Sequence, residues 1–362
     1  MIQKEKIALF YGGNSSEAEV SVKSGKNVAS CISKEKYQVY EILLRGESWR
    51  VLNPNGEEID IQIPLQYLNA AIESEQACST APGTAKIANI KCNIGVEVDK
   101  TKFSFINNGK EIKFDMAYIM IHGTPGENGL LQGYFEMLGI PYNTCSSFVS
   151  AITFDKHSCK RFLDFSGVKM AKDVFIRRGE SYSTSQIIKE LSLPIFVKPT
   201  NGGSSFGVTK VKREEDLKAA IDFVFKDYDS AILEECLVGR ELTNGIYFNG
   251  KELVKLPVTE IITEREFFDY QAKYLGESKE VCPAEISEDL TKRIQQTSEK
   301  LYKYLGCSGL VRMDYIVCSE DIYFLEINTV PGMTSMSLVP AQVRVAGIKI
   351  EDFFETLIST IK

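Results

Sequence analysis

The sequence predicts an α/β (α+β) protein with more than one domain. Near its start, "KIALFYGGNSSEAEV" joins an apolar strand to a glycine turn and the beginning of a helix. Its last third contains two apolar strands, Leu310–Cys318 and Ile322–Asn328, followed by a helix near Ile350–Ile361. The chain has 362 residues, which is enough for two or three domains with separate cores.

Composition and charge narrow the class of protein. Hydrophobic residues make up 44% of the chain and charged residues 25%, as in ordinary globular proteins. The net charge of −7 argues against a nucleic-acid or anionic membrane partner. No apolar run approaches the roughly 20 residues of a membrane span, and the N-terminus lacks the pattern of a signal peptide.

Cysteine and histidine usage adds two expectations. The nine cysteines are scattered without a CxxC pair, which favours reduced thiols and a cytoplasmic location. His122 and His157 are the only two histidines, so a multi-histidine metal site cannot form.

The first 152 residues are predicted to form an open α/β domain. Lys6–Tyr11 is a buried strand, and Ser15 or Ser16 is placed to cap the helix that follows. A region from about 50 to 114 is predicted as an insertion. It carries the hairpin "KFSFINNGKEIKF", with Asn108-Gly109 as its tight turn.

Two further domains are predicted at 153–242 and 243–362. Thr153 resembles a helix cap, and Phe165 is expected on the core face of that helix. "LPIFVKPTNGGSSFGVTKV" and "AILEECLVGRELTNGIYF" each have a strand–loop–strand pattern. The segment 267–283 is long for a simple connection and is interpreted as a lid, since long loops are often functional.

Four polar residues interrupt the apolar pattern of the two C-terminal strands. Alternation places Arg312 and Asp314 on one face of the first strand, and Glu326 and Asn328 on one face of the second. A connection of three or five residues would set Asp314 opposite Glu326 and Arg312 opposite Asn328. A two-residue turn would shift the register by one and turn the pairs to opposite faces.

Carboxylate and amide oxygens without histidine or cysteine are hard ligands that suit Mg²⁺. Asp314, Glu326 and Asn328 therefore form a candidate magnesium site, with the Arg312 guanidinium beside it. The alternative is a solvent-facing edge strand with an Arg312–Asp314 pair, although such a pair adds only ~0–1 kcal/mol.

A glycine-rich loop follows a strand lysine in "VKPTNGGSSFGV". Backbone N–H groups of such a loop, the hydroxyls of Ser204 and Ser205, and the Lys198 ammonium could together bind phosphate. The loop lacks the GxxxxGK[ST] pattern, and an ordinary tight hairpin is the alternative. Lys156, near a helix start, could likewise be a plain surface lysine.

A third candidate follows the strand "AILEE". Glu234 and Glu235 could present a carboxylate and backbone groups to an adenine edge, and Glu241 could bind ribose hydroxyls. An exposed turn is the alternative interpretation of this stretch.

In their order along the chain, these motifs resemble the D-alanine–D-alanine ligases of the ATP-grasp superfamily. The matching stretches are "GGNSSEAEVS", "HGTPGENG", "DKHSCKRFL", "VKPTNGGSSFG", "ILEECLVGRE", "FDYQAKY", "VRMDYIV" and "LEINTVPGMTSMSLVP". They cover most of the chain except about 50–114.

The resemblance implies a three-domain ATP-grasp architecture: a Rossmann-like N-terminal domain and two α+β domains that grip ATP. It also implies ATP-dependent joining of two D-alanines through an acyl phosphate, for peptidoglycan precursors. A homodimer and Mg²⁺, or Mn²⁺, are implied as well. The implied ATP-binding residues are Lys156, Lys198, Gly203, Ser204, Ser205, Glu234, Glu235, Leu237 and Glu241. The implied ligands of two magnesium ions are Asp314, Glu326 and Asn328.

The same resemblance implies residues for the amino acids. The first D-alanine would be bound by Glu17 with His122 nearby, and the second D-alanine's carboxylate by Lys273 and Ser337. Glu17, Ser204 and Tyr274 would form a hydrogen-bonded triad. Arg312 and the N–H of Gly332 would stabilise the tetrahedral intermediate.

Two positions depart from the family pattern without explanation: Asn128 replaces an aspartate and Gln271 a glutamate. Tyr274 stands where the D-lactate-accepting relatives have phenylalanine, so an amine nucleophile is expected. The competing hypotheses are another ATP-grasp ligase, including one that joins D-alanine to D-lactate, and a non-catalytic nucleotide-binding regulator. A regulator has no reason to keep Arg312 beside three metal ligands.

Overall fold

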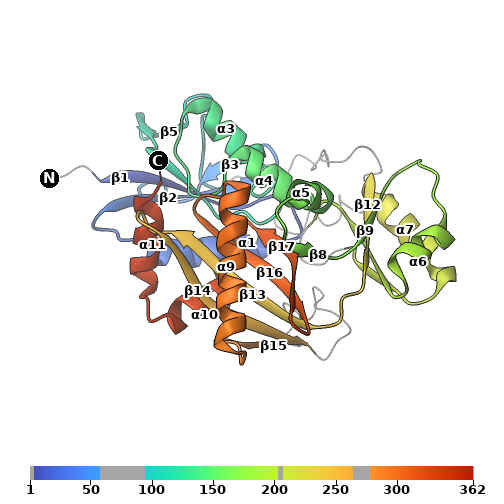
Figure 1. Ribbon diagram of the computed structural model, residues 1–362. Coiled ribbons are helices and arrows are strands. Elements are labelled where there is room, and N and C mark those ends of the chain that lie inside the picture. Colours follow the sequence, from blue (N-terminus) through green and yellow to red (C-terminus); the bar gives the residue numbers. More distant parts are fainter. Residues whose placement is uncertain (1–3, 58–93, 203–206, 264–277, 362) are drawn as a thin grey trace.

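The computed structural model describes residues 4–57, 94–202, 207–263 and 278–361. The described chain forms three sheets with helices packed against them, and a separate two-stranded hairpin (Figure 1). Three clusters of buried apolar side chains form its core. Among the described helices, none has the length and apolar character needed to cross a bilayer.

The first sheet has five strands in the order β4-β3-β2-β1-β7. They span Val96–Glu97, Ser48–Val51, Tyr37–Arg45, Glu5–Gly12 and Met116–Ile119. β1 is parallel to β2 and β7, and helix α1 (Ala18–Cys31) connects β1 to β2. The strand predicted from Lys6 to Tyr11 is thereby confirmed. It lies between β2 and β7, and its apolar residues are fully buried.

The hairpin predicted in the 50–114 region is also confirmed. β5 (Ser104–Asn107) pairs with β6 (Lys110–Lys113) around Asn108 and Gly109. Both turn residues have positive φ, 49° and 77°, as a tight two-residue hairpin turn requires.

The prediction that Ser15 or Ser16 caps α1 is wrong. The helix begins at Ala18 after Glu17, and no side chain caps it. Ser15 Oγ instead accepts a hydrogen bond from the Glu17 N–H at 3.3 Å and donates to the His122 carbonyl at 2.8 Å. The serine therefore ties the turn before α1 to the segment that follows β7.

Three short helices follow β7: α3 (Leu130–Leu138), α4 (Ser147–Phe154) and α5 (Lys156–Leu163). Thr153 lies inside α4, where its hydroxyl donates to the Val149 carbonyl, so the predicted cap is wrong. Asp155 caps α5 instead, by accepting from the Ser158 N–H at 2.7 Å. Phe165 is 93% exposed beyond the end of α5, which contradicts its predicted place in the core.

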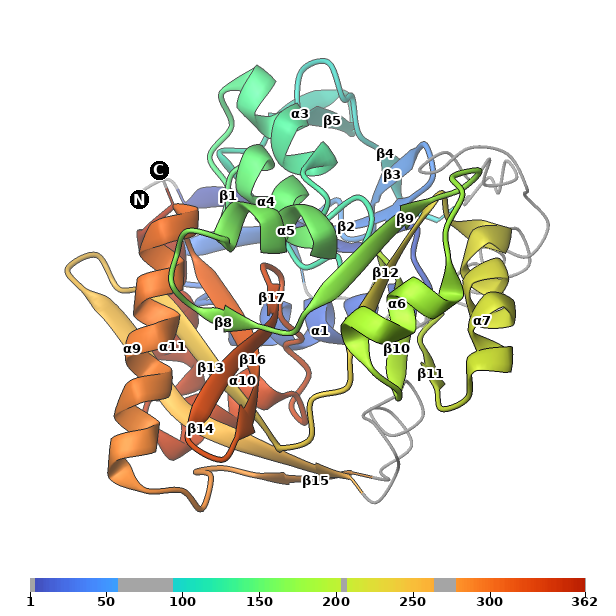
Figure 2. The ribbon, with the colours of Figure 1, turned by 45° about the vertical axis from the view of Figure 1, so that its right-hand side comes forward.

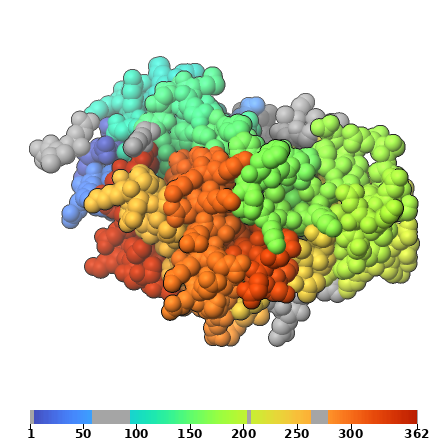
Figure 3. Space-filling view, in the orientation of Figure 1, coloured from blue at the N-terminus to red at the C-terminus, as the bar shows by residue number. Residues whose placement is uncertain are grey.

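The second sheet has four antiparallel strands in the order β11-β10-β12-β9. They span Thr209–Val211, Ile195–Pro199, Ser230–Glu235 and Asp173–Arg177. Helices α6 (Thr184–Leu191) and α7 (Glu214–Asp227) pack against this sheet and close a core of their own. This central unit forms one end of the molecule (Figure 3).

The third sheet has six strands in the order β15-β14-β13-β16-β17-β8. They span Ser278–Val281, Leu253–Thr263, Arg240–Phe248, Leu310–Cys318, Asp321–Asn328 and Lys169–Met170. Helix α9 (Glu288–Leu305) packs on β13 and β14. Consecutive strands β12 and β13 belong to different sheets, so the chain passes from the central unit to the C-terminal sheet between them.

The last two helices, α10 (Leu338–Val345) and α11 (Ile350–Ser359), contribute to the core of the first sheet. The N-terminal and C-terminal parts of the chain therefore share one hydrophobic cluster. The boundaries near residues 153 and 242 stay a prediction. Of the predicted lid, residues 278–281 form edge strand β15, and residues 264–277 lie outside the described residues.

Candidate functional site

The β16–β17 hairpin brings the four predicted polar residues together. Arg312 pairs with Asn328, and Asp314 with Glu326, as the sequence predicts. The predicted three- or five-residue connection is wrong, however, because Cys318 pairs with Asp321 across a two-residue turn.

A β-bulge resolves the conflict between this turn and the observed register. The register shifts by one residue between Asp314 and Tyr315, which leaves Leu325 as the extra residue of β17. A bulge of this kind inserts one residue and returns the following side chains to the other face. Asp314 and Glu326 therefore lie opposite each other despite the short turn.

Asp314 is the centre of the hydrogen bonding in this hairpin. Its carboxylate accepts from Arg312 Nε at 2.9 Å and from a terminal guanidinium nitrogen at 2.8 Å. Asn328 Nδ2 donates to Oδ2 at 3.0 Å, and the Thr243 hydroxyl of β13 donates to Oδ1 at 2.5 Å. The alternative of a solvent-facing pair does not fit, since Asp314 is only 5% exposed.

Charges from three parts of the chain act on Arg312. Burial acts to lower the pKa of its guanidinium, but the carboxylates of Asp314, Glu326 and Glu127 outweigh burial and raise that pKa. Arg312 therefore stays charged in a site that shields it from water. It links the hairpin to Glu127, which lies in the loop after β7.

The central sheet contributes Lys198 and Glu234 from neighbouring strands β10 and β12. Lys198 Nζ is 2.6 Å from Glu234 Oε2. Burial acts to lower the pKa of Lys198, but Glu234, Glu326 and Glu241 together raise it. Because Glu326 belongs to β17, Lys198 and the β16–β17 hairpin share one electrostatic neighbourhood. Figure 2 shows where β17 and β10 lie in the molecule.

Sequence reasoning missed a second lysine beside Glu234. Lys160 of α5 is 4% exposed, and its ammonium is 2.7 Å from Glu234 Oε1 and 3.0 Å from Asp173 Oδ1. It also donates to the Ala171 carbonyl at 2.7 Å. Burial alone would raise the pKa of Glu234, yet Lys198 and Lys160 lower it to about 2.

A sequence signal for Lys160 exists in hindsight. It lies four residues after Lys156, so both lysines share one face of α5. A buried lysine needs an anionic partner, but the sequence offers no way to choose Asp173 and Glu234 from the 49 acidic residues.

Lys156 lies at the entrance to the glycine loop. Its N–H donates to the Thr200 carbonyl at 2.9 Å, and its Nζ donates to the Gly202 carbonyl at 2.8 Å. The start of α5 is thereby attached to the start of the loop, which does not fit a plain surface lysine. Gly203, Ser204 and Ser205 lie outside the described residues.

The predicted adenosine residues lie at the passage between the two sheets. The Glu235 carboxylate accepts from the Lys172 N–H at 2.8 Å, which fixes the end of β12 to the segment before β9. Leu237 is half-buried in the loop that follows, and Glu241 is half-buried on β13. Glu241 is close enough to Lys198 to help raise its pKa.

On the N-terminal side, Glu17 is accompanied by a carboxylate that the sequence analysis did not single out. Glu127 Oε2 accepts from the Gly123 N–H at 2.8 Å, and Oε1 accepts from the Val330 N–H at 3.2 Å. Burial and the charge of Glu17 raise the pKa of Glu127 to about 8, against the opposing effect of Arg312. The motif "HGTPGENG" contains this residue, but its type alone gave no reason to select it.

The ring of His122 is held at both nitrogens. Nδ1 is 2.9 Å from the Val330 carbonyl and Nε2 is 3.1 Å from the Ser24 hydroxyl. A carbonyl can only accept, so Nδ1 carries the proton and Nε2 accepts from Ser24. Burial lowers the pKa of His122, which agrees with a neutral ring.

Gly332 and Ser337 approach each other closely. A Cβ on Gly332 would lie 3.0 Å from Ser337 Oγ, so a larger residue would press on the serine. Ser337 Oγ also accepts from the Thr334 N–H at 3.0 Å. Glycine at position 332, directly after Pro331, therefore lets the backbone pass close to Ser337. Lys273, Tyr274 and Gln271 lie outside the described residues, and nothing in the structure explains Asn128.

The donor set fits Mg²⁺. Two carboxylates and an amide oxygen are hard ligands, and Mg²⁺ usually takes one or two carboxylates together with substrate phosphates. No group of three or more His, Cys, Asp or Glu side chains suited to a metal forms within the described ranges. Asp314, Glu326 and Asn328 would supply three oxygen ligands, and phosphate or water would supply the rest of the octahedral shell that Mg²⁺ prefers.

Comparison with known proteins agrees with this geometry. The family model described as D-ala D-ala ligase N-terminus matches residues 6–145, and the one described as D-ala D-ala ligase C-terminus matches residues 162–359. The chain is 41% identical to the D-alanine–D-alanine ligase of Phocaeicola vulgatus over 98% of both chains. It is 42% identical to that of Bacteroides thetaiotaomicron over 98% of both chains.

Solved structures that resemble this chain are ligases of the same family. VanG, a D-Ala:D-Ser ligase from Enterococcus faecalis, superposes with a TM-score of 0.80 at 32% identity over 99% of both chains. The D-alanine–D-alanine ligase from Bacillus anthracis complexed with ATP has a TM-score of 0.71 at 25% identity, covering 98% of this chain and 97% of that one. The chain therefore belongs to the D-alanine–D-alanine ligase family.

Proposed function

We propose that this protein joins two D-alanines to D-alanyl-D-alanine at the expense of ATP, for peptidoglycan precursor synthesis. Family membership supports the reaction class. The observation that carries the proposal is the joint position of Arg312, Asp314 and Glu326 beside Lys198. That arrangement provides positive charge and metal ligands in one site, as phosphoryl transfer requires.

The reaction proceeds in two steps. A carboxylate oxygen of the first D-alanine attacks the γ-phosphorus of ATP, and ADP leaves with the electrons of the broken P–O bond. The amine of the second D-alanine then attacks the acyl carbon, loses a proton, and phosphate leaves. Both steps develop negative charge on oxygen, so fixed cations and N–H donors should dominate catalysis.

We assign the nucleotide to the interval between the central and C-terminal sheets. The proposed ATP-binding residues are Lys156, Lys198, Gly203, Ser204, Ser205, Glu234, Glu235, Leu237 and Glu241. Lys198 would hold phosphate while Glu234 accepts from adenine. Lys160 keeps Glu234 ionised and oriented from the opposite side.

We assign the amino acids to the side of the site formed by the N-terminal loops. Glu17 would bind the ammonium of the first D-alanine, with His122 behind it. Lys273 and Ser337 would bind the second D-alanine's carboxylate, and Glu17, Ser204 and Tyr274 would form the triad. Arg312 and the Gly332 N–H would stabilise the tetrahedral intermediate.

Mg²⁺ would be held by Asp314, Glu326 and Asn328, with Mn²⁺ suited to the same oxygen ligands. Two ions are proposed, by resemblance to the family. When bound, the metal supplies positive charge that offsets the charge of the phosphates. Arg312 orients Asp314 for this purpose through its two hydrogen bonds.

We further propose a homodimer in the cytoplasm and three domains at 1–152, 153–242 and 243–362, with a lid at about 267–283. The exposed apolar side chains Leu130, Met137 and Phe148 of α3 and α4 are available for a subunit contact. Light scattering of the purified protein tests the oligomeric state directly.

The decisive experiment is an incubation with ATP, Mg²⁺ and D-alanine, followed by mass spectrometry for the dipeptide and a coupled assay for ADP. We expect equal amounts of both products, and no ADP without D-alanine. D-serine, D-lactate and L-alanine are offered as competing acceptors, because one structural relative is a D-Ala:D-Ser ligase. Preferred incorporation of D-serine or D-lactate, or the absence of any ligation, would overturn the proposal.

A further inference from the structure

The backbone around Pro331-Gly332 is held by side chains from a distant part of the chain. Before the break, the Val330 N–H donates to Glu127 Oε1 at 3.2 Å, and the Val330 carbonyl accepts from His122 Nδ1 at 2.9 Å. Both partners lie in the segment after β7, about 200 residues earlier in the sequence.

After the break, two side chains of helix α1 hold the backbone of Met333. Its N–H donates to Ser24 Oγ at 3.1 Å, and its carbonyl accepts from Asn27 Nδ2 at 2.7 Å. Ser24 is fully buried, and Asn27 is half-buried one turn further along the helix. Every N–H and carbonyl of the two residues that flank Pro331-Gly332 therefore has a side-chain partner.

The two pairs of contacts are linked through one hydroxyl. Ser24 Oγ accepts from the Met333 N–H and is 3.1 Å from Nε2 of His122. Because Nε2 is unprotonated, Ser24 uses its hydroxyl proton for the histidine and its lone pair for Met333. Loss of this hydroxyl removes the support of the His122 ring as well as the contact to Met333.

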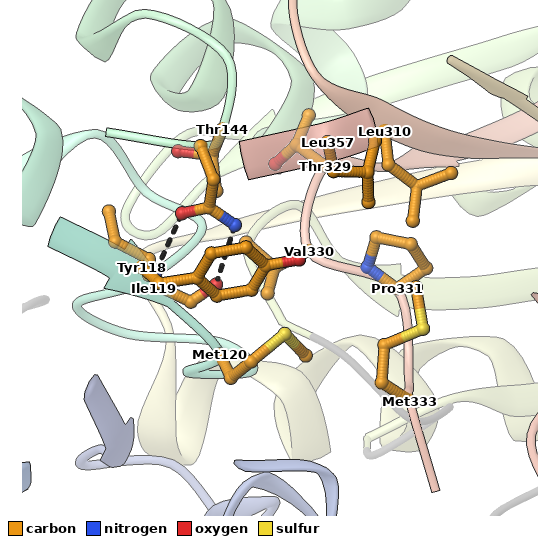
Figure 4. A pocket seen from close by; sticks show the side chains of 11 residues that line it. Tyr118, Ile119, Met120, Thr144, Leu310, Thr329, Val330, Pro331, Met333 and Leu357 are labelled. Atoms are coloured by element: carbon orange, nitrogen blue, oxygen red, sulfur yellow. Dashed lines mark hydrogen bonds between the residues drawn. The ribbon is translucent and has the colours of Figure 1, made fainter. Parts of the chain in front are cut away.

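Packing against this segment is incomplete. A small cavity lies between the end of β7 and the segment 329–333, and Val330, Pro331 and Met333 line it (Figure 4). Its volume of about 20 Å³ is sufficient for one water-sized occupant. Packing therefore leaves room beside the segment, and the four hydrogen bonds fix the backbone of Val330 and Met333.

Between the two anchored residues, Gly332 alone can donate a backbone hydrogen bond, because Pro331 has no N–H. No described residue accepts a hydrogen bond from the Gly332 N–H. Its direction is set by the peptide units that Val330 and Met333 fix on either side.

We propose that Ser24 and Asn27 are positioning residues for the ligation step, which act by holding the Gly332 N–H in place. This inference rests on the function proposed above, in which that N–H meets the charge that develops on the acyl oxygen. Neither side chain needs to touch substrate, since both act through the backbone of Met333. Catalytic donors must be aimed at the transition state, so a small displacement reduces the rate rather than nucleotide binding.

The test compares Asn27→Ala and Ser24→Ala with wild type and with two matched controls. Asn107→Ala removes an amide at the end of β5 that donates to the Pro54 carbonyl at 2.9 Å and to Asn55 Oδ1 at 3.1 Å. Ser150→Ala removes a buried helix hydroxyl that donates to the Cys145 carbonyl at 3.3 Å. The controls lose the same kind of bond without affecting residues 330–333.

We expect kcat for dipeptide formation to fall roughly 10- to 100-fold in Asn27→Ala and Ser24→Ala, as misplacement of a catalytic group predicts. The KM for ATP should stay within about twofold of wild type, and both controls should keep wild-type kcat. Affinity for a dipeptide analogue with a tetrahedral phosphinate in place of the peptide carbonyl should fall by the same factor as kcat.

The outcomes separate the two proposals. If the wild type makes dipeptide and both variants match their controls in kcat and phosphinate affinity, this inference is overturned while the function stands. If the wild type makes no dipeptide, both are overturned. Should Ser24→Ala fail to fold, Asn27→Ala decides the matter, because it replaces a half-buried side chain.

Discussion

The guanidinium of Arg312 forms a two-pronged hydrogen bond with the carboxylate of Asp314, at 2.9 and 2.8 Å, on one face of strand β16. The two residues are separated by a single residue of the same strand. Asp314 is thus held by the same side chain that is proposed to meet the transition state. The proposed metal ligand and the proposed catalytic cation are therefore oriented together.

Arg312→Lys tests that coupling. Lysine keeps the charge but cannot form the planar fork, so both the orientation of Asp314 and the aim of the cation are lost. We expect kcat to fall roughly 100- to 1,000-fold, the usual effect of removing one transition-state donor. Arg213→Lys is the control, because it removes another two-pronged pair, with Asp216, at the exposed N-terminus of α7. An equal effect of both variants would contradict the assignment.

Glu326→Ala tests the metal site. Loss of this carboxylate should lower ATP-dependent phosphate release by more than about 100-fold, since a metal contributes several kcal/mol of charge stabilisation. Phosphate release is measured over a Mg²⁺ titration, with circular dichroism to confirm the fold. Glu320→Ala is the control, since its side chain is 92% exposed at the turn of the same hairpin. Wild-type turnover by Glu326→Ala would exclude Glu326 as a ligand.

Lys160→Gln tests the ion cluster around Glu234. Removing one partner from a buried cluster typically lowers the free energy of unfolding by about 3–5 kcal/mol. Glu234 would then keep one of its two described lysine partners, Lys198, so the KM for ATP should rise. Denaturant unfolding and KM measurements check the two effects. Lys189→Gln, on the exposed side of α6, should change neither.

The depressed pKa of Glu234 should also make the free energy of unfolding depend on pH in the acidic range. Its pKa is about 2 in the folded protein, below the ordinary value of 4.5. The stabilisation is therefore present above pH 4.5 and is lost as the pH falls toward 2. In Lys160→Gln, where the pKa of Glu234 should be less depressed, the loss should still begin near pH 4.5, but it should be smaller and be complete at a higher pH than in wild type.

Glu127→Gln tests the raised pKa of Glu127. In the folded protein burial and Glu17 raise that pKa to about 8, whereas the ordinary value is 4.5. Between these values the unfolded chain has released the proton and the folded chain retains it, so stability falls as pH rises. Glutamine does not titrate, so we expect wild type to lose stability relative to Glu127→Gln from pH 5 to 8. Parallel curves from denaturant unfolding would refute the raised pKa.

Tyr274→Phe tests acceptor choice. The family's D-lactate-accepting relatives have phenylalanine at this position, so removal of the hydroxyl should raise the ratio of D-lactate to D-alanine incorporated. The ratio is measured by mass spectrometry with both acceptors present. Tyr304→Phe, on the exposed face of α9, is the control. An unchanged ratio would count against the specificity role of Tyr274.

Sequence patterns correctly predicted those features whose conformation depends only on residues nearby in the sequence. The Asn108-Gly109 turn, strand β16 and the four-residue polar face of β16–β17 are confirmed. Each depends on alternation or on backbone angles within a few residues. One of the wrong predictions concerns a helix cap, where two nearby residues are equally suitable by type. Asp155 caps α5, whereas Thr153 was expected to be the cap.

The length of the β16–β17 connection was predicted wrongly, because a feature outside the turn sets the register. The rule that a two-residue turn shifts the register is correct for an uninterrupted ladder. The bulge at Leu325 adds one residue to β17 and so shifts the register, and no turn signal in the sequence marks its position. The predicted pairing is nevertheless right, because the acids and the arginine gain from sharing one face.

From the residues alone one can predict the β16 strand, the polar face of the C-terminal hairpin and the family. Tertiary structure decided which side chains complete the site: Lys160 beside Glu234, and Ser24 and Asn27 on Met333. These partners lie 74 to 309 residues apart. Periodicity reports only which face a side chain occupies, whereas contacts between distant segments depend on how three sheets and their helices pack together.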